Sequence, residues 1–535
     1  MKRYTLLFTI CFIAIYFVSC RPMGDDLLSY GQNDYQAFYD SERSFAGEFK
    51  ALWTAMNENY CIWDYEAEYG IDWDDVYNTY LPLFEALDDT TRKEKVTDQE
   101  LRNLYSQFID SLHDGHMALQ IKNLHTGKYI TLQPGVTRNI RERGQQYLAE
   151  GKYITNLNAY QTTAINPNYN ILQHSEINSS KVSAQIISTV CSNAIKAANE
   201  YIALVDNAGG PNPTNDSLYK SVKDLTQYCI QLLTANNPES ANFNFTIQAY
   251  NNLCNEYKKI GEMIGVKLTP IEDAVANDGL KKLEYSLFAD GIVYLRLGSF
   301  SLTTYLDPTL QTTDSSTMLF AYQSAVQKVW QEWFDAIQIH HIAGNLGGVI
   351  IDVRNNGGGY INDYKYVLGA LLPSGNWNSH TLRIKNGIGR LDYAPLLPFT
   401  MGTMEEQHEV IDDAPIVVLA NSRSVSMAEN TTYGVLSQAN GCFIGTRTFG
   451  ALSALNTDPA DYSSTYSGAF GVQNQTPIWG YIPKYVCLYG EELRPVEGYG
   501  FAPDIEVQLD TTLWLTTGRD NQLEAAIKYI NNVAP

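Results

Sequence analysis

The sequence has few basic residues and no basic segment. Among its 535 residues, Lys and Arg number 37 against 59 Asp and Glu, which gives a formal net charge of −22. Proteins that bind nucleic acid draw much of their affinity from clustered Lys and Arg at the phosphates, so this composition argues against a nucleic-acid partner. We interpret the acidic excess mainly as a contribution to solubility.

Cysteines are also few, and their spacing is wide and irregular. The sequence contains 8, and no two of them form a C-x-x-C pair. Neither a zinc ribbon nor a redox dithiol is therefore indicated. We expect most of the cysteines to be buried free thiols, although export would permit one or two disulfides.

Hydrophobic residues are plentiful, at 44% of the chain with 12% aromatic. So much apolar side chain over this length must bury at least one large core, which excludes disorder, collagen and a small disulfide scaffold. No internal repeat is visible. At about 150 residues per domain, the length predicts about three domains.

The amino terminus carries the features of an export signal. Two positive charges precede an apolar run over residues 4–18, and small Ser19 follows it. The run is short for a membrane span, which needs about 20 apolar residues, and its order of charge, apolar run and small residue is typical of a secretory signal. A signal anchor is the alternative.

The end of this signal resembles a bacterial lipobox. The residues are Phe17-Val18-Ser19-Cys20. In that case residues 1–19 would be removed, Cys20 would be lipidated, and residues 20–40 would tether the protein to a membrane.

Helical periodicity dominates residues 41–121. Apolar residues recur at helical spacing from 45 to 60 and over 74–87. A third helix starts at the capping box of Thr97 and Glu100 and is expected to continue to Asp114-Gly115, since glycine suits a helix end. His116 then opens a strand-like alternation, so we expect it at a helix-to-strand junction.

Residues 122–285 carry no motif for chemistry. Helical stretches around 182–205, 217–234 and 240–263 are separated by segments rich in Gly, Asn and Pro. We expect a mainly helical inserted or cap domain here.

Residues 286–535 alternate between strand and helix patterns, which predicts an α/β core. Two of the strands are near-continuous apolar runs, as in strands buried on both faces. The expected strands are 291–297, 348–353, 415–420 and 442–445, and the expected helices are 314–339, 361–371 and 426–439.

Two segments of this core resemble active-site loops. Gly357-Gly358-Gly359 follows a buried strand and leaves unhindered N–H groups that suit an oxyanion. Ser426 lies where another buried strand leads into a helix, near free N–H donors and the positive end of the helix dipole. The alternative is that Ser426 is only a helix N-cap.

Five segments in order resemble the S41 family of serine peptidases, which comprises the carboxy-terminal processing and tricorn-like proteases. Any one of them would be a weak signal, whereas five in sequence are strong. They are Leu112 to His116, Asp352 to Gly359, Ser424 to Glu429, Ile444 to Gly450, and Val496 to Ile505.

The resemblance implies a ClpP/crotonase-like spiral core and makes Ser426 the nucleophile. The processing branch has a lysine base after the Phe-Gly pair, where this sequence has Ala451, and no Lys occurs between 385 and 484. The tricorn-like branch instead places a histidine at the position of His116 and a glutamate at that of Glu497. A Ser426–His116–Glu497 triad is therefore expected, with Glu497 hydrogen-bonded to the imidazole.

The family also implies an oxyanion hole, formed by the N–H of Met427 with that of Gly358 or Gly357, Gly358 being slightly favoured. It implies no cofactor and no metal, and a protein or peptide substrate. Each site residue keeps a simpler alternative: His116 as a loop histidine, or with His113 as part of a metal site, and Glu497 as an exposed carboxylate.

Two further points qualify the resemblance. Residues 122–285 show no PDZ pattern, although many members of the family carry such a domain, and Gly115 stands where some tricorn-like members have a serine. The expected protein is an exported, lipid-anchored serine endopeptidase of the periplasm or cell surface. The rival is a catalytically silent lipoprotein of the same fold that binds peptides or glycans.

Overall fold

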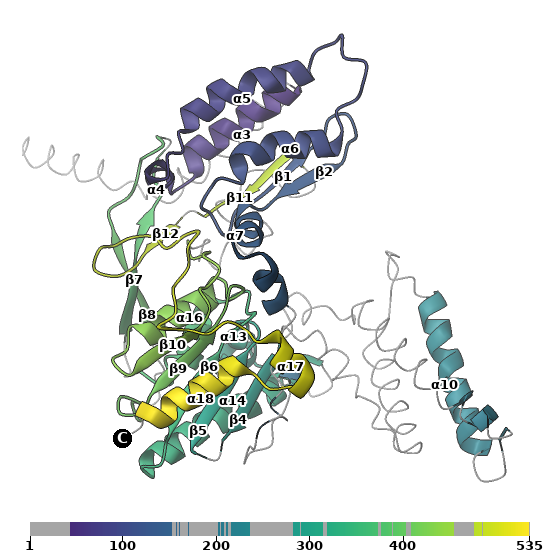
Figure 1. Cartoon of the computed structure of the whole chain (residues 1–535), viewed down its shortest axis with the longest axis vertical. Helices are drawn as coiled ribbons and strands as arrows, with labels where there is room; N and C mark the ends of the chain where they lie inside the picture. The colour runs from purple at the N-terminus through teal and green to yellow at the C-terminus, as the bar shows by residue number, and fades with distance from the viewer. Residues whose placement is uncertain are drawn as a thin grey trace, which may run out of the picture. The chain divides into compact units, whose positions relative to one another are not determined.

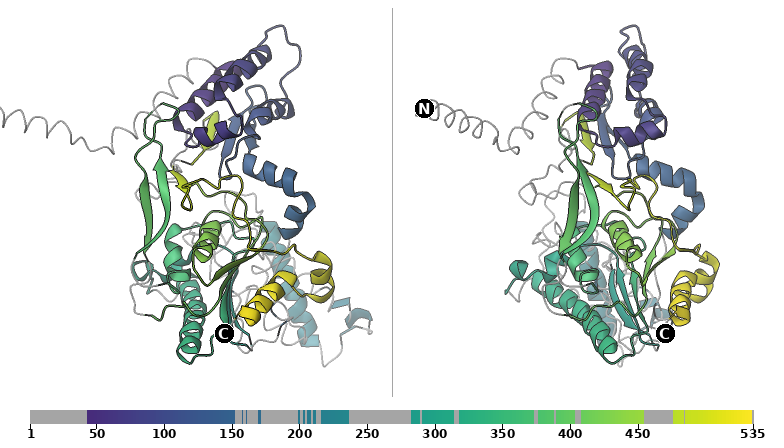
Figure 2. Two further views of the ribbon diagram at one scale, coloured as in Figure 1. Left: turned by 60° about the vertical axis from the view of Figure 1, so that its left-hand side comes forward. Right: turned by 90° about the vertical axis from the view of Figure 1, so that its left-hand side faces the viewer.

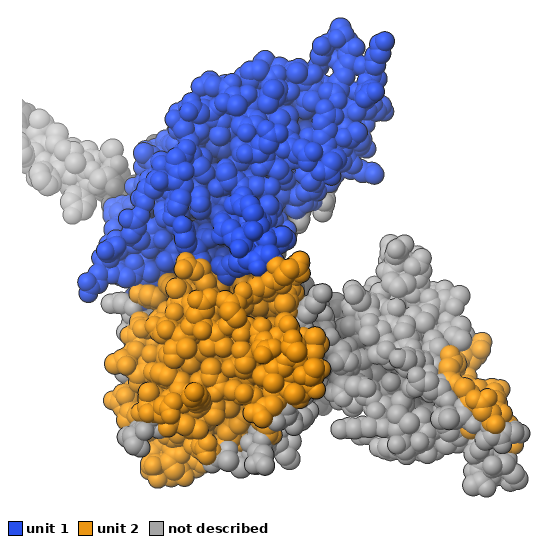
Figure 3. Space-filling view, viewed as in Figure 1, with its two compact units in different colours: residues 1–144, 378–400, 449–500 blue, residues 145–377, 401–448, 501–535 orange. Residues whose placement is uncertain are grey.

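The computed structural model describes residues 43–151, short stretches between 157 and 211, residues 216–235, and residues 282–533 apart from gaps at 289, 314–317, 373–375, 388, 403–407, 454–475 and 484. The chain divides into two compact units, which Figure 3 shows in different colours. Unit 1 comprises residues 1–144, 378–400 and 449–500, and unit 2 comprises residues 145–377, 401–448 and 501–535.

Unit 2 is built on a seven-stranded sheet in the order β13-β10-β9-β6-β5-β4-β3 (Figure 1). The five strands β5, β6, β9, β10 and β13 run parallel to one another. β4 pairs antiparallel with β5, and β3 pairs antiparallel with β4. The strands are β3 Tyr169–Asn170, β4 Lys282–Leu287, β5 Ile292–Leu297, β6 Gly348–Asp352, β9 Ile416–Ala420, β10 Gly441–Gly445 and β13 Ile505–Glu506.

Helices cover both faces of this sheet, so β5, β6 and β9 are buried along their whole length. Figure 2 shows α14 and α18 on opposite sides of the strands. One face packs Ile350, Val417 and Ile444 against Leu523 and Ile530 of α18. The helices are α10 Asp216–Ala235, α13 Leu302–Leu306, η2 Pro308–Leu310, α14 Met318–Ile342, η3 Ile361–Asp363, α15 Tyr364–Val367, α16 Met427–Leu436, α17 Thr511–Thr517 and α18 Asn521–Val533.

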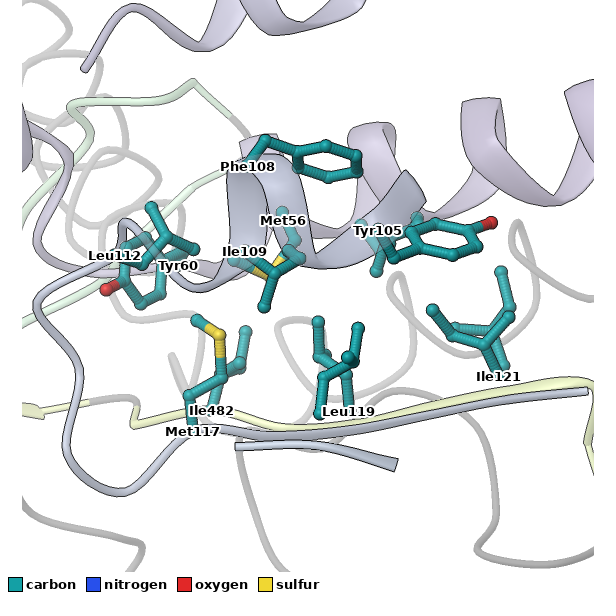
Figure 4. Close-up of a cluster of buried hydrophobic side chains, with 14 of the residues drawn as sticks. Met56, Tyr60, Tyr105, Phe108, Ile109, Leu112, Met117, Leu119, Ile121 and Ile482 are labelled. Atoms are coloured by element: carbon teal, nitrogen blue, oxygen red, sulfur yellow. The ribbon is translucent and has the colours of Figure 1, made fainter. Parts of the chain in front are cut away.

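Unit 1 packs helices on a three-stranded antiparallel sheet in the order β11-β1-β2. In Figure 4, Ile109 of α6 points toward Leu119 of β1, whereas Phe108 lies on the opposite side of α6, where its ring contacts Phe49 and Trp73. These side chains belong to one apolar core of this unit. The elements are α3 Phe45–Asn59, α4 Trp63–Glu68, α5 Trp73–Leu87, α6 Asp98–Ile109, β1 Ala118–Lys122, β2 Tyr129–Leu132 and β11 Ile478–Tyr481.

Some elements pass from one unit into the other. α7 (Pro134–Glu150) is interrupted at Gly144, whose φ of 54° lies outside the helical region, and unit 1 gives way to unit 2 at this residue. A second small sheet, in the order β12-β7-β8, consists of Tyr485–Leu488, Asn376–Ile384 and Leu397–Gly402.

The expected α/β core is confirmed, including its buried strands. The helix that begins after Thr97 is confirmed with its N-cap, but it ends at Ile109 rather than near Gly115. The helix expected over 361–371 is wrong in length, since it consists of a short 3-10 turn and α15.

Within the inserted region, α10 confirms the predicted stretch 217–234. The helices expected around 182–205 and 240–263 lie mostly outside the described residues, as do the signal over 1–19, Cys20 and the tether over 20–40. Each of the two units is assembled from separate segments of the chain, and the domains expected over 41–121, 122–285 and 286–535 stay a prediction.

Cys61, Cys442 and Cys487 are buried free thiols, as expected. In the described part of the chain, none of the helices has the length and apolar character of a membrane span.

Candidate active site

Ser426 occupies a turn between strand β9 and helix α16. It directly precedes Met427, the first residue of α16, and its backbone has φ 57° and ψ −112°. A positive φ costs a residue with a side chain about 1–2 kcal/mol, so the surrounding structure must hold it. One such restraint is the hydrogen bond from the N–H of Ser426 to Glu429 Oε2, at 3.1 Å.

Two hydrogen bonds join this turn to the loop after β6. The N–H of Val425 donates to the carbonyl of Asn356 at 2.9 Å. The hydroxyl of Ser424 donates to the carbonyl of Val353 at 2.8 Å. The serine turn and the glycine loop of unit 2 are therefore fixed against each other.

Gly358 makes the closest approach between these two loops. A Cβ on Gly358 would lie 2.7 Å from the Cβ of Ser426, 2.8 Å from the carbonyl oxygen of Val425 and 3.1 Å from the nitrogen of Met427. Its φ of 89° is also in the left-handed region. Only glycine fits here, both for lack of space and for its backbone conformation.

The donors of the expected oxyanion hole differ in availability. The N–H of Gly358 donates to the side-chain oxygen of Asn356 at 2.8 Å. No described residue accepts a hydrogen bond from the N–H of Met427 or Gly357. These two groups keep the capacity to bind a developing negative charge.

His116 belongs to unit 1 and lies in the loop between α6 and β1. Oδ1 of Asp114 accepts hydrogen bonds from the N–H groups of His116 (2.9 Å) and Met117 (2.8 Å). The side chain of Asp114 thus fixes the two residues that directly precede β1. Within the described residues, the buried Nδ1 of His116 has no hydrogen-bond partner.

The surroundings of His116 favour its neutral form. Burial lowers the pKa of the imidazole below its usual value, and this effect exceeds the opposing influence of the Glu497 charge and of a hydrogen bond with the Ser453 backbone. A neutral imidazole is the form that accepts a proton in general base catalysis.

Glu497 is almost fully buried, at 1% exposure, and its carboxylate binds backbone N–H groups. Oε1 accepts from Gly115 (2.8 Å), and Oε2 accepts from Leu452 (2.8 Å) and Ser453 (2.6 Å). The exposed-carboxylate alternative is therefore wrong. Among the described residues, the carboxylate makes no hydrogen bond to the His116 ring, whose buried Nδ1 has no partner.

Gly115 lies too close to the neighbouring loop to carry a side chain. A Cβ there would be 2.2 Å from the carbonyl oxygen of Gly450 and 2.5 Å from the Cβ of Ala451. This contact explains why a serine has no room at the position before His116.

His113, which the sequence offered together with His116 as a possible metal ligand, is hydrogen-bonded to Glu66. Its N–H donates to Oε1 at 2.7 Å, and its Nδ1 lies 2.9 Å from Oε2. The described residues contain no group of three or more His, Cys, Asp or Glu that could hold a metal ion. Sequence reasoning missed Glu66, since no local pattern links it to a histidine 47 positions later.

Comparison with known families agrees with this arrangement in unit 2. Residues 291–477 match the model of peptidase family S41. The chain carries a domain of peptidase family S41. The matched residues include Ser426, Met427 and the glycine loop, whereas His116 and Glu497 lie outside them.

Similar proteins are known in bacteria. The carboxy-terminal-processing protease of Bartonella bacilliformis is 25% identical over 241 residues, which are 45% of this chain and 44% of that protein. This chain therefore matches less than half the length of that relative.

Among solved structures, a peptidase from Parabacteroides merdae matches with a TM-score of 0.45 and 16% identity over 91% of this chain and 97% of the other. Mature CPAF matches with a TM-score of 0.44 and 12% identity over 92% and 98%.

Proposed function

We propose that the protein is a serine endopeptidase in which Ser426 attacks the peptide bond. The observation that carries this proposal is the strained turn of Ser426, pressed against Gly358 beside the uncommitted N–H of Met427. A simple helix N-cap needs neither a positive φ nor a glycine loop packed against it. Membership of family S41 supports the same chemistry.

The reaction is acyl transfer with His116 as general base. The Oγ of Ser426 bonds to the scissile carbonyl carbon while its proton passes to His116. The imidazolium then returns this proton to the leaving amine as the C–N bond breaks, and water hydrolyses the acyl-enzyme by the same route. General acid–base help of this kind contributes about 10² to 10⁴-fold.

The oxyanion is bound by the N–H groups of Met427 and Gly357. Each such donor contributes about 2.7–4 kcal/mol to the transition state. Because donors at fixed backbone positions need no reorganisation during the reaction, rigid loops suit this role.

Glu497 acts on His116 in two ways. Its three hydrogen bonds to backbone N–H groups fix the loop that carries the histidine. Its negative charge also favours the imidazolium that forms during attack, as its effect on the pKa of His116 indicates.

We further propose that the enzyme is exported and anchored to a membrane by a lipid on Cys20. The support is the sequence of the amino-terminal signal alone. Cys20→Ala should abolish incorporation of a clickable fatty acid and move the protein from the detergent phase to the aqueous phase of Triton X-114. Unchanged partition would remove the anchor from the account.

The catalytic proposal is tested by cleavage of casein or a quenched peptide library. Wild type should cleave, and Ser426→Ala should retain no activity above background while keeping the wild-type circular dichroism. Equal inactivity of both proteins would instead favour the rival function, a lipoprotein that binds peptides or glycans without hydrolysing them.

A further inference from the structure

The carboxyl-terminal end of α7 contacts both the loop that carries Ser426 and the loop that carries Gly357 and Gly358. Glu150 is the last residue of α7 and only 1% exposed. Burying a carboxylate is costly unless hydrogen bonds satisfy it. The partners of Glu150 therefore indicate what it holds in place.

The carboxylate of Glu150 is bound by four donors. Oε2 accepts from the N–H of Ser422 at 3.0 Å and from the Ser422 hydroxyl. Oε1 accepts from the hydroxyl of Thr446 at 2.8 Å and from the side chain of Gln146 at 2.9 Å. Four donors around an acceptor-only group suit an ionised carboxylate. Ser422 lies four residues before Ser426, and Thr446 directly follows β10.

The main chain of Glu150 holds the other loop. Its carbonyl accepts from the side chain of Asn355 at 2.8 Å. Asn355 has a φ of 58° and opens the segment that leads to Gly357 and Gly358. Its N–H also donates to the side chain of Asn421, at 3.1 Å. One residue therefore binds the serine loop with its carboxylate and the glycine loop with its carbonyl.

A second contact strengthens this attachment. The guanidinium of Arg423 lies over the ring of Tyr147, 3.9 Å from its centroid, and its Nε donates to the Tyr147 carbonyl at 3.0 Å. A cation–π contact of this kind contributes about 0.5–2 kcal/mol. Two side chains thus join the end of α7 to the loop before Ser426: Glu150 binds Ser422, and Arg423 binds Tyr147.

We propose that Glu150 is a positioning residue that sets the distance between the N–H groups of Met427 and Gly357. The inference rests on the proposed function, because it concerns the oxyanion hole of that reaction. Donors act on the transition state only when they lie within hydrogen-bond distance of the oxyanion, so a small displacement of one loop costs rate rather than substrate affinity.

The test compares Glu150→Ala and Glu150→Gln with Glu284→Gln. Glu284 is a matched control, since it is also buried in unit 2, at 2% exposure, but lies on β4, which β5 separates from β6 in the sheet. The readouts are the second-order rate of Ser426 labelling by a fluorophosphonate, kcat and KM on a peptide substrate, and the melting temperature.

Glu150→Ala should slow labelling and lower kcat by about 10²-fold, the scale on which small misplacements act, with KM little changed. Glu150→Gln should show a smaller loss than Glu150→Ala in the same parameters, because the amide keeps one of the two acceptor oxygens and alanine keeps neither. Glu284→Gln should label at the wild-type rate whatever its melting temperature. Wild-type labelling and kcat in both Glu150 variants, or a raised KM with kcat intact, would overturn the proposal.

If Glu150→Ala does not fold, Glu150→Gln and Ser422→Ala decide the question, since Ser422→Ala removes a single donor to the carboxylate. A wild-type rate in both would overturn the inference, and a reduced kcat at constant KM would support it. Failure of the wild-type protein itself to label would instead contradict the proposed function, so the two failures are distinguishable.

Discussion

Gly358 lies so close to Ser426 that a Cβ added to the glycine would stand 2.7 Å from the serine Cβ. Real Cβ atoms do not approach to this distance, so Gly358→Ala must move one of the two loops. We expect kcat to fall by about 10²-fold or more, because the nucleophile and the N–H of Met427 shift together.

Gly357→Ala is the control for that substitution. A Cβ at Gly357 would meet nothing within 4 Å, and the N–H is retained. Its effect on kcat should be much smaller. Equal losses in the two variants would show that steric contact with Ser426 is not the cause.

Gly115→Ala should disturb the loop that carries His116. The new Cβ would meet backbone atoms of Gly450 and Ala451, which cannot give way as a flexible side chain does. We expect a lower melting temperature and a slower acylation step, measured by stopped-flow with an ester substrate. Gly127→Ala, which carries positive φ but no clash, should change only the melting temperature. Wild-type acylation in Gly115→Ala would contradict this packing.

Activity should depend on pH in a way that reports His116. Burial lowers the pKa of this imidazole, so kcat/KM should rise through an acidic limb below the usual pKa of 6.5 and be constant at neutral pH. Glu497→Gln removes a charge that raises this pKa, so the limb should move to lower pH by about one unit while kcat also falls. A limb that moves to higher pH would contradict the assignment of His116 as base.

A second histidine should make stability depend on pH. His380 is buried and stacked on Phe399, at 4.7 Å between ring centroids, and burial lowers its pKa to about 4. Because the unfolded chain binds this proton at about pH 6.5, the contribution is fully present above that pH and is lost as the pH falls towards 4.

His380→Phe keeps the stacking and removes the titration. Its melting temperature should therefore decline less than that of wild type between pH 7 and pH 4.5. Parallel declines in the two proteins would show that other groups cause the acid sensitivity.

Sequence patterns found the parts of the site that local structure determines. The apolar runs that became β6 and β9, and the glycine and serine segments after them, are continuous in sequence and carry their own signals of strand, turn and helix. The predicted end of α6 was wrong: the helix ends at Ile109, and Asp114, which accepts hydrogen bonds from the N–H groups of His116 and Met117, already lies in the following loop.

Long-range contacts had no such signal. Glu150 and Ser422 are 272 positions apart, and nothing in the pattern around either residue predicts their hydrogen bonds. The same holds for β11, which pairs with β1 in unit 1 although it lies far along the chain. The resemblance to family S41 pointed to Glu497, but not to its hydrogen bonds, since its partners are backbone N–H groups of two separate loops.

The most direct test of the account is covalent labelling by a fluorophosphonate, with the modified residue located by peptide mass spectrometry. Wild type should carry one label, on Ser426, and His116→Ala should label more slowly by about 10²-fold or more. A label on another residue, or an unchanged labelling rate in His116→Ala, would contradict the assignment of Ser426 as nucleophile and His116 as its base.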